Sequence, residues 1–491
     1  MTTKTTEALL ALLAGVLPPR ALLVGDAVDP RYQEDRRNRP SARPPFVVRP
    51  GSTAEVAATL AACHDFHQPL VVQGGRTGLS GAHRIRAGEA VLSLERLTTV
   101  TPVSPGASTV LAEAGAPLQR VQEAAQEAGQ IFGVDIGARG TATIGGNIAT
   151  NAGGIRVLRY GMFRAQVAGL EAVLADGTIL NGLADVAKDN SGYDLNQLFI
   201  GSEGTLGIVT RALLRLHPRP AIEANAFLAM PSVEAALALL ARLRGAVGSS
   251  LSAFEIMMPG AYHGVTAHLG ITPPLAIRAP AYVLAEIQAE ACAAEAEEVF
   301  MATLVAAMEE GVALDAVMSQ SPRDFQALWE MRDGCADYVR SLNHVASGDI
   351  SVPTARAAEF LRDSQAALRA IDPQTAFHVF GHLGDGNLHY VFQTSQKEAA
   401  MARLLALVAD YGGSISAEHG IGVDKKPFLH LTRSPGQIAT MRRLKAALDP
   451  RMILNPGRIF DMDSAGPDRG ALRRETMKRL PRFRGIHRQM R

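Results

Sequence analysis

The chain has 491 residues, which is enough for two or three domains with a full hydrophobic core. Hydrophobic residues make up 47% and charged residues 20%, and the formal net charge is +1. This balance is typical of a soluble globular protein and gives no general reason to expect nucleic acid as a partner or a membrane as an anchor. No apolar run reaches the roughly 18 residues of a membrane-spanning helix, so we expect no transmembrane segment.

Three cysteines occur, Cys63, Cys292 and Cys335, and their spacing matches neither a disulfide framework nor a zinc-thiolate site. This usage favours a reduced, cytoplasmic protein. Peripheral attachment to the inner face of the membrane is the alternative location.

The first part of the chain is expected to alternate short helices and strands. An amphipathic helix around Leu9–Leu17 is followed by a polar, Arg-rich link. A helix from about residue 54 to residue 67 comes next, because Ser52 or Thr53 can cap it and Glu55 is placed to close a capping box. Further strands are expected at 91–94 and 109–113, and a helix at 118–128.

Three glycine-rich stretches stand out in this part. The strand PLVVQ opens into the loop GGRTGLSG, whose backbone N–H groups can converge on an anion, although a plain surface turn is the alternative for this loop alone. The loop is neither a Walker loop nor a dinucleotide fingerprint. The second stretch spans Gly133–Gly161 and the third contains GSEGTLGIV, with a hairpin around Asp176-Gly177 between them. Together they offer a groove of backbone donors suited to an extended, phosphate-bearing cofactor.

The stretch Phe377–Phe392, FHVFGHLGDGNLHYVF, predicts a β-hairpin with a two-residue type I′ turn at Asp385-Gly386. Such a turn places His382 directly opposite His389, with Cβ atoms roughly 4.5–5.5 Å apart. Two imidazoles at this separation can share one divalent metal ion. The plainer alternative is a pair of ordinary histidines at a sheet edge.

A carboxylate for the same ion is expected from SAEHGIG, where Glu418 and His419 are adjacent. Two histidines and one carboxylate form a catalytic metal set that leaves one position open for a substrate. Adjacent residues of a regular strand face opposite ways, so Glu418 and His419 can share one site only if this segment is a bend. His378 complicates the choice of ligands, because strand alternation places it on the same face as His382.

The motifs VVQGGRTGLSG, TIGGNIATNAGG, RYG, SGYDL, GSEGTLGIV, GHLGDGNLH, SAEHGIG and ILNPG resemble those of the FAD-dependent D-2-hydroxyacid dehydrogenases of the vanillyl-alcohol-oxidase type. The resemblance covers most of residues 40 to 460. It implies an α+β fold, with a PCMH-type FAD-binding domain and a cap domain that contains an antiparallel sheet. The expected organisation is 1–44 N-terminal helix and link, 45–220 FAD-binding domain, 221–430 cap or substrate domain, 431–460 return to the FAD domain, and 461–491 basic tail.

The resemblance also implies which residues hold FAD. They are Gln73, Gly74, Gly75, Arg76, Thr77, Gly78, Gly137, Thr143, Gly145, Gly146, Asn147, Thr150, Asn151, Gly153, Gly161, Glu203, Gly204, Gly207, Ile208, Val209 and Asn455. For Asn455, a turn-forming Asn-Pro is the simpler account. Relatives that bind flavin covalently use a His or Cys in these loops, and this chain has neither there, so we expect non-covalent FAD.

For catalysis, a divalent metal, Zn in preference to Mn, held by His382, His389 and Glu418 would lower the pKa of the substrate hydroxyl. His419 is then the natural general base. Arg332, in LWEMRD, matches the substrate-carboxylate arginine of the family, and a surface arginine on a helix is the alternative.

The expected substrate is a D-2-hydroxy acid. Where D-2-hydroxyglutarate enzymes have Thr, Lys and Asn, this chain has Ala336, Ser347 and Val391, which favours a monocarboxylate such as D-lactate or a larger apolar or aromatic homologue. D-2-hydroxyglutarate dehydrogenase, a metal-independent FAD oxidase and a flavin subunit of a glycolate oxidase complex are the alternatives.

Electrons are expected to leave to a quinone, an electron-transfer flavoprotein or a cytochrome, because no dinucleotide fingerprint is visible. A homodimer is compatible with the sequence. The stretch from Gly466 to Arg491 carries nine basic and two acidic residues, as a solvated tail or a contact for an acidic partner would.

Overall fold

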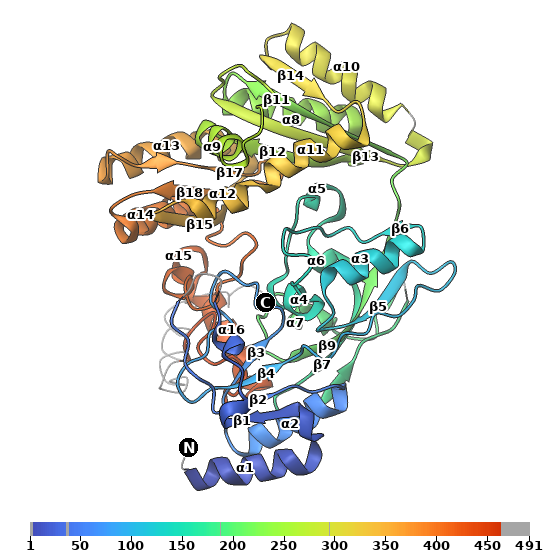
Figure 1. Ribbon diagram of the computed structural model, residues 1–491, viewed down its shortest axis with the longest axis vertical. Helices are drawn as coiled ribbons and strands as arrows, with labels where there is room; N and C mark the ends of the chain where they lie inside the picture. The colour runs from blue at the N-terminus through green and yellow to red at the C-terminus, as the bar shows by residue number, and fades with distance from the viewer. Residues whose placement is uncertain (1–2, 36–38, 187, 294, 463–491) are drawn as a thin grey trace, which may run out of the picture.

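The computed structural model describes residues 3–35, 39–186, 188–293 and 295–462. The predicted basic tail, except for residues 461 and 462, lies outside this part of the chain. Figure 1 shows two halves. The lower half holds the first part of the chain together with α15 and α16, and the upper half holds the residues between them.

The lower half is built from helices and short strands. In chain order these are α1 Thr3–Val16, β1 Leu22–Val24, β2 Phe46–Val48, α2 Thr53–Asp65, β3 Leu70–Gln73, β4 Ala90–Ser93, β5 Thr109–Glu113, α3 Leu118–Glu127, β6 Gln130–Ile131, α4 Ile144–Thr150, α5 Val157–Tyr160, α6 Phe163–Gln166, β7 Val167–Val173, β8 Ile179–Asn181, α7 Asn196–Phe199, β9 Ile208–Arg215 and β10 His217–Pro218, with α15 Leu429–Thr432 and α16 Pro435–Leu448 joining later.

Two sheets organise this half. The first has the order β1-β2-β4-β3, in which β2, β4 and β3 run parallel, and the second has the antiparallel order β5-β9-β7-β8. Strand β4 is buried along its whole length, as a continuous apolar run in a parallel sheet should be. The predicted hairpin around Asp176-Gly177 is confirmed as β7 and β8, which pair antiparallel.

The upper half is an antiparallel sheet covered by helices on both faces. Its elements are β11 Ile222–Met230, α8 Val233–Val247, β12 Leu251–Met257, α9 Pro259–Leu269, β13 Ala281–Ala289, α10 Ala296–Glu309, β14 Asp315–Met318, α11 Pro322–Asp333, α12 Cys335–Ser341, β15 Val345–Ser351, α13 Ala357–Ile371, β16 Ala376–Phe377, β17 Phe380–His382, β18 Asn387–Gln393 and α14 Lys397–Asp410. The strand order is β14-β11-β13-β12-β17-β18-β15, with β16 also paired to β18.

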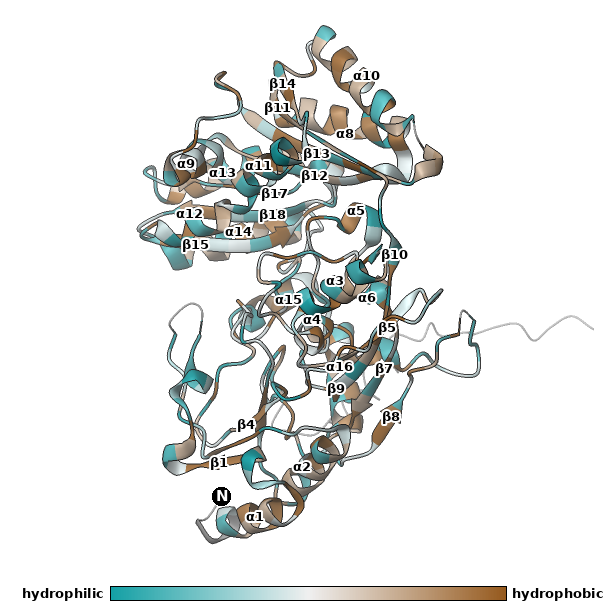
Figure 2. Cartoon of the chain, turned by 45° about the vertical axis from the view of Figure 1, so that its right-hand side comes forward, coloured by the Kyte–Doolittle hydropathy of each residue, from teal (hydrophilic) through white to brown (hydrophobic). Residues whose placement is uncertain are grey.

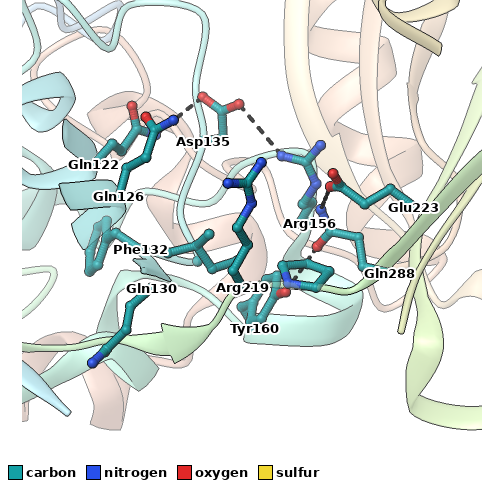
Figure 3. A pocket seen from close by; sticks show the side chains of 13 residues that line it. Gln122, Gln126, Gln130, Phe132, Asp135, Arg156, Tyr160, Arg219, Glu223 and Gln288 are labelled. Carbon is teal, nitrogen blue, oxygen red and sulfur yellow. Dashed lines mark hydrogen bonds and ion pairs between the residues drawn. The ribbon is translucent and has the colours of Figure 1, made fainter. Parts of the chain in front are cut away.

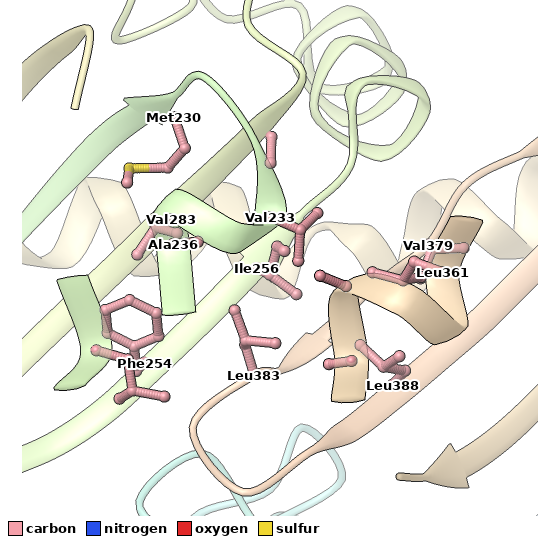
Figure 4. Close-up of a cluster of buried hydrophobic side chains, with 14 of the residues drawn as sticks. Met230, Val233, Ala236, Phe254, Ile256, Val283, Leu361, Val379, Leu383 and Leu388 are labelled. Atoms are coloured by element: carbon pink, nitrogen blue, oxygen red, sulfur yellow. The ribbon is translucent and has the colours of Figure 1, made fainter. Parts of the chain in front are cut away.

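Strand alternation divides the core of this half between the two faces of the sheet. Phe254, Ile256 and Val283 face helices α8, α10, α13 and α14, in one cluster with Val233 and Leu361 (Figure 4). The opposite face packs against α9, α11 and α12. The expected α+β architecture is therefore confirmed, with helices segregated onto the faces of a mostly antiparallel sheet.

The register predicted for the histidine hairpin is wrong by two residues. His382 on β17 lies opposite Asn387, and His389 on β18 lies opposite Phe380. A type I′ turn needs positive φ at both central residues, whereas of Asp385 and Gly386 only Gly386 has one, of 82°. The Asp385 carboxylate accepts the Asn387 N–H at 3.0 Å, and the connection becomes a longer loop. A shift of two residues in the register keeps each side chain on the same face of the sheet, so His382 and His389 still point to one side of it.

The two halves are joined by polar contacts around α5. This helix lies beneath β12 in both views (Figures 1 and 2). Arg156, just before α5, donates from Nε to Glu286 Oε1 on β13 at 2.8 Å, and Tyr160 donates to Gln288 Oε1 at 2.9 Å. Because Glu286 is fully buried, its charge depends on this pairing.

The C-terminal segment completes the lower half. Leu454 forms a parallel bridge with Leu70 at the free edge of β3. The buried Lys445 on α16 donates to Thr205 O and Leu454 O, each at 2.7 Å, and to Asp449 Oδ2 at 2.5 Å. All three ammonium protons are thus used, which is what a buried lysine requires. Within the described part of the chain, no helix combines the length and hydropathy needed to cross a bilayer.

Replacing Arg156 by Met should destabilise the protein, because Glu286 would be left as a buried charge without its guanidinium partner. We expect a loss of about 3–5 kcal/mol in the free energy of unfolding, measured by urea denaturation. Arg242→Met is the matched control, since Arg242 pairs with Glu310 on the surface, and should cost at most about 1 kcal/mol. Equal effects of the two substitutions would contradict this account of the junction.

Candidate active site

The SAEHGIG segment is a bend held by one buried carboxylate. Asp349 on β15 is 2% exposed, and its Oδ2 accepts the backbone N–H groups of Glu418 at 2.9 Å and His419 at 3.0 Å. Asn387 donates to the other oxygen at 3.0 Å. Two successive N–H groups aimed at one oxygen cannot belong to a regular strand, so the side chains of Glu418 and His419 leave the bend close together.

The structure brings the three predicted metal ligands together. One donor atom from each of His382, His389 and Glu418 lies within 4.8 Å of the others. The two imidazole centroids are 5.3 Å apart, and His382 Nε2 is 3.8 Å from Glu418 Oε1. His378 lies elsewhere, with Nδ1 3.0 Å from Tyr338 Oη and Nε2 3.1 Å from Gln393 Oε1.

The pKa values of His382, His389 and Glu418 are shifted in different directions. Burial lowers the pKa of His382, but the adjacent Glu255 carboxylate outweighs that effect and raises it to about 9. Burial holds the pKa of His389 well below its ordinary value and raises the pKa of Glu418 to about 7. In the metal-free protein at neutral pH, the His382 ring is therefore protonated on both nitrogens, and a metal ion must displace one of these protons.

His419 and Arg332 lie on two sides of this group. His419 Nδ1 is 3.5 Å from Asp349 Oδ2, and its ring lies nearly parallel to that of His389, with centroids 6.3 Å apart. Arg332, on α11, is buried, and its Nη2 is 3.5 Å from the ring nitrogens of His382. The arginine is therefore not a surface residue.

The predicted cofactor loops pack directly against one another. A Cβ atom on Gly74 would lie 2.3 Å from Thr143 Oγ1, and one on Gly75 would lie 1.8 Å from Thr141 O. No side chain fits at Gly75, because its close neighbour is backbone, and at Gly74 the Thr143 side chain would have to move. The first and second glycine-rich stretches therefore form one continuous surface.

Buried polar atoms along this surface have no partner within the described protein. They are Gln73 Oε1, Thr143 Oγ1 and Asn147 Nδ2. An amide oxygen, a hydroxyl and an amide nitrogen left unsatisfied are costly unless a ligand or solvent bonds to them. Their chemistry fits a cofactor that carries phosphate, hydroxyl and ring-nitrogen groups, so the residues present fit FAD.

The cofactor loops also contact the bend that carries Glu418 and His419. A Cβ atom on Gly153 would lie 2.6 Å from Glu418 Oε1. Ser80, at the end of the first glycine loop, donates to His419 O at 2.8 Å. The buried Glu203 accepts the N–H groups of Ile421 at 2.6 Å and Gly422 at 2.8 Å. Each of the three glycine-rich stretches therefore touches the segment that carries Glu418.

Glu203 and Asn455, both predicted to contact FAD, have side chains engaged within the protein. Glu203 fixes the end of the bend, as described above. Asn455 accepts the Val72 N–H at 2.9 Å and donates to Glu203 O at 2.6 Å, so its amide ties β3 to the third glycine stretch. This contact is more specific than the turn that Asn-Pro suggests.

The other predicted cofactor residues lie along the same loops. Arg76, Thr77 and Gly78 follow β3, Gly137 precedes α4, Gly145, Gly146, Thr150 and Asn151 lie in or beside α4, Gly161 ends α5, Gly204 lies against Asn455, and Gly207, Ile208 and Val209 lie at the start of β9. At Gly207 the close neighbour is Phe199, so packing alone accounts for that glycine.

The sequence analysis missed the structural roles of Glu255 and Asp349. Both are buried acidic residues in strands of the upper sheet, β12 and β15. A carboxylate at a core position is rare unless it is paired or bound to a metal, so each was a visible signal of a nearby polar site. Their partners come from distant segments, which is why the sequence did not identify those partners.

A separate cavity of about 240 Å³ lies at the junction of the halves (Figure 3). Gln122, Asp135 and Arg156 line it from the lower half and Glu223 and Gln288 from the upper half. None of the predicted cofactor, metal or catalytic residues lines this cavity.

Two family models match the chain. Residues 44–182 match the family described as "FAD binding domain", and residues 219–459 match "FAD linked oxidases, C-terminal domain". The chain is 41% identical over 444 residues to D-2-hydroxyglutarate dehydrogenase of Xanthomonas citri pv. viticola, covering 88% of this chain and 93% of the relative. It is 38% identical over 459 residues to the mitochondrial D-2-hydroxyglutarate dehydrogenase of Bos taurus, covering 92% and 83%.

Among solved structures, the 4-ethylphenol oxidase from Gulosibacter chungangensis superimposes with a TM-score of 0.75 at 16% identity, covering 94% of this chain and 98% of that one. The p-cresol methylhydroxylase superimposes with a TM-score of 0.75 at 14% identity, covering 95% and 99%. At this identity the likeness concerns the fold, and it confirms the PCMH-type architecture expected from the sequence motifs.

The stability of metal-free protein should fall as pH rises from about 6.5 to about 9, because the folded-state pKa of His382 is raised above its ordinary value. The contribution of His382 to the free energy of unfolding is fully present below pH 6.5 and is lost as pH passes about 9. The contribution of Glu418 also falls as pH rises, but it is already lost by about pH 7. Urea denaturation with chelator present, on wild type and His382→Gln, measures the effect. An equally steep decline in the variant would contradict the assignment.

Proposed function

The chain belongs to the FAD-dependent D-2-hydroxyacid dehydrogenases, and from this premise we propose that it oxidises a D-2-hydroxy monocarboxylate at the site formed by His382, His389, Glu418 and His419. The observation that carries the proposal is the contact between the cofactor loops and the bend, above all Gly153 against Glu418. The metal-binding donors and the FAD loops thereby share one site. A hydroxy acid bound there would be close to both.

The donor set supports a divalent metal. Two imidazoles and one carboxylate, a donor set that leaves the fourth position of a tetrahedral ion open, suit Zn, and Mn is the second choice. When bound, such an ion supplies a Lewis acid that lowers the pKa of the substrate hydroxyl. The FAD is proposed to be non-covalent, since neither 74–81 nor 133–161 contains a His or Cys.

The protein residues then have separate tasks. The Arg332 guanidinium binds the substrate carboxylate, a geometry to which its planar donors are suited. His419 accepts the hydroxyl proton on its imidazole, and Asp349, 3.5 Å from Nδ1, stabilises the resulting charge. A flavin held by the cofactor loops would supply the acceptor for the α-hydrogen and its electron pair, and the product would be the 2-oxo acid.

The surroundings of His389 support an apolar substrate side chain. The Phe380 ring is 5.0 Å from the His389 ring, and Val391, the next residue along on the same face, is buried in the apolar cluster of α9 and α11. Ser347 is paired with Val391 on the neighbouring strand. D-2-hydroxyglutarate is the second candidate, because the two relatives named above carry that activity in their names.

We also propose that electrons pass from FAD to a quinone, an electron-transfer flavoprotein or a cytochrome in the cytoplasm. The choice of acceptor rests on the missing dinucleotide fingerprint, and the location rests on the cysteine usage.

Purified protein should contain FAD and one divalent metal ion per chain, measured by absorbance and by elemental analysis. After treatment with a chelator, the flavin spectrum should persist, but reduction of the flavin by a D-2-hydroxy acid should slow by at least about 100-fold, because the hydroxyl is no longer acidified. Added Zn²⁺ or Mn²⁺ should restore the rate. A chelator-insensitive rate with stoichiometric peroxide would instead indicate a metal-independent oxidase.

Substrate preference can be measured by steady-state kinetics with a dye acceptor. We expect kcat/KM to be higher for D-lactate or D-mandelate than for D-2-hydroxyglutarate, because a second carboxylate beside Phe380 and Val391 would be desolvated without compensation. L-lactate serves as the stereochemical control. A kcat/KM for D-2-hydroxyglutarate far above the other values would replace the first candidate by the second.

A further inference from the structure

A single buried carboxylate joins the metal-binding group to the substrate-binding arginine. Glu255 on β12 is 1% exposed. Its Oε1 lies 2.6 Å from His382 Nδ1, and its Oε2 accepts from Arg332 Nε at 2.7 Å and pairs with Arg332 Nη2 at 2.6 Å. The three residues come from β12, β17 and α11, so only the folded upper half assembles them.

The contact with His382 fixes which ring nitrogen is available to a metal ion. When Nδ1–H donates to a carboxylate, the lone pair of the neutral ring is on Nε2. Nε2 is the nitrogen that faces Glu418, at 3.8 Å from Oε1. A carboxylate behind a ligating histidine also raises the basicity of the ring and holds its plane.

The contact with Arg332 fixes one edge of the guanidinium. Nε and Nη2 are occupied by Glu255, while Nη1 lies 4.0 Å from Asp333 Oδ1, which is 42% exposed. The arginine is thereby held over the His382 ring, with Nη2 3.5 Å from both ring nitrogens. The Glu255 carboxylate therefore sets the positions of His382 and Arg332 relative to each other.

We propose that Glu255 is a positioning residue of the active centre, which holds His382 in its metal-binding tautomer and Arg332 beside the metal. The inference rests on the proposed function, since it assumes a metal at His382, His389 and Glu418. It predicts that a change at Glu255 weakens metal binding without any change to the ligands themselves.

The chain contains a matched comparison. Glu286 on β13 is also fully buried and also pairs with an arginine, Arg156, and it accepts from Trp329 Nε1 at 2.7 Å. Its carboxylate bonds to Arg156, Ser252 and Trp329, none of which is a histidine of the metal group. If buried Glu–Arg pairs act only on stability, substitutions at Glu255 and Glu286 should have the same consequences.

The experiment compares Glu255→Gln and Glu286→Gln in the full-length, FAD-loaded protein. The dissociation constant for Zn²⁺ is measured by competition with a chromogenic chelator, beside the flavin spectrum and the melting temperature. Glu255→Gln should weaken Zn²⁺ binding about 10–100-fold, the range found for outer-shell partners of ligating histidines, and should raise KM for the D-2-hydroxy acid. Glu286→Gln should lower only the melting temperature.

A pair of variants separates the histidine contact from the buried charge. In Arg332→Met, Glu255 still holds His382, so Zn²⁺ affinity should stay within about threefold of wild type. In the double variant Glu255→Gln, Arg332→Met, which leaves no unpaired charge, affinity should fall as in Glu255→Gln. The inference would be overturned if the affinity for Zn²⁺ were unchanged both in Glu255→Gln and in the double variant. Failure of wild type itself to bind Zn²⁺ or Mn²⁺ would instead refute the metal site.

Discussion

The active centre depends on one buried carboxylate, that of Asp349. Its Oδ2 accepts two successive backbone N–H groups, those of Glu418 and His419, and hydrogen bonds to a charged acceptor are worth about 1.5–3 kcal/mol each. Burial raises the pKa of Asp349, but the neighbouring His419 and Lys425 outweigh it and hold the pKa well below its usual value. The lowered pKa favours the charged form that shapes the bend, from which Glu418 lies near His382 and His419 near His389.

The local parts of this architecture follow from the sequence because they rest on local chemistry. Ser52 caps α2 as expected, and β5 spans Thr109–Glu113, the range that strand alternation indicates. The candidate metal-binding cluster was also predictable in composition, since His382 and His389 stay on one face of the sheet although their register differs by two residues from the predicted one. The error itself arose from Asp385, whose carboxylate bonds to Asn387 and lengthens the loop, a choice that the Asp-Gly pattern does not reveal.

What the sequence does not reveal is pairing across long separations. Glu255 and Arg332 are 77 residues apart, Asp349 and Glu418 are 69 apart, and Glu203 and Gly422 are 219 apart. The sequence shows each of these acidic residues, but not the distant residue with which it pairs. Their partners are set by the order of strands in the upper sheet and by how the bend meets the lower half. The residues that bind are therefore easier to identify than the residues that hold them in place.

The lower half is discontinuous in sequence, and this affects how the protein is made. The edge of β3 is paired with Leu454, and Val72 bonds to Asn455. Strand β3 of the lower half therefore lacks its edge partner until the last tenth of the chain has left the ribosome. The upper half, by contrast, is encoded without interruption and can close earlier. During synthesis the edge of β3 therefore stays unpaired until residues 454 and 455 are available, and an unpaired strand edge is a site at which aggregation can begin.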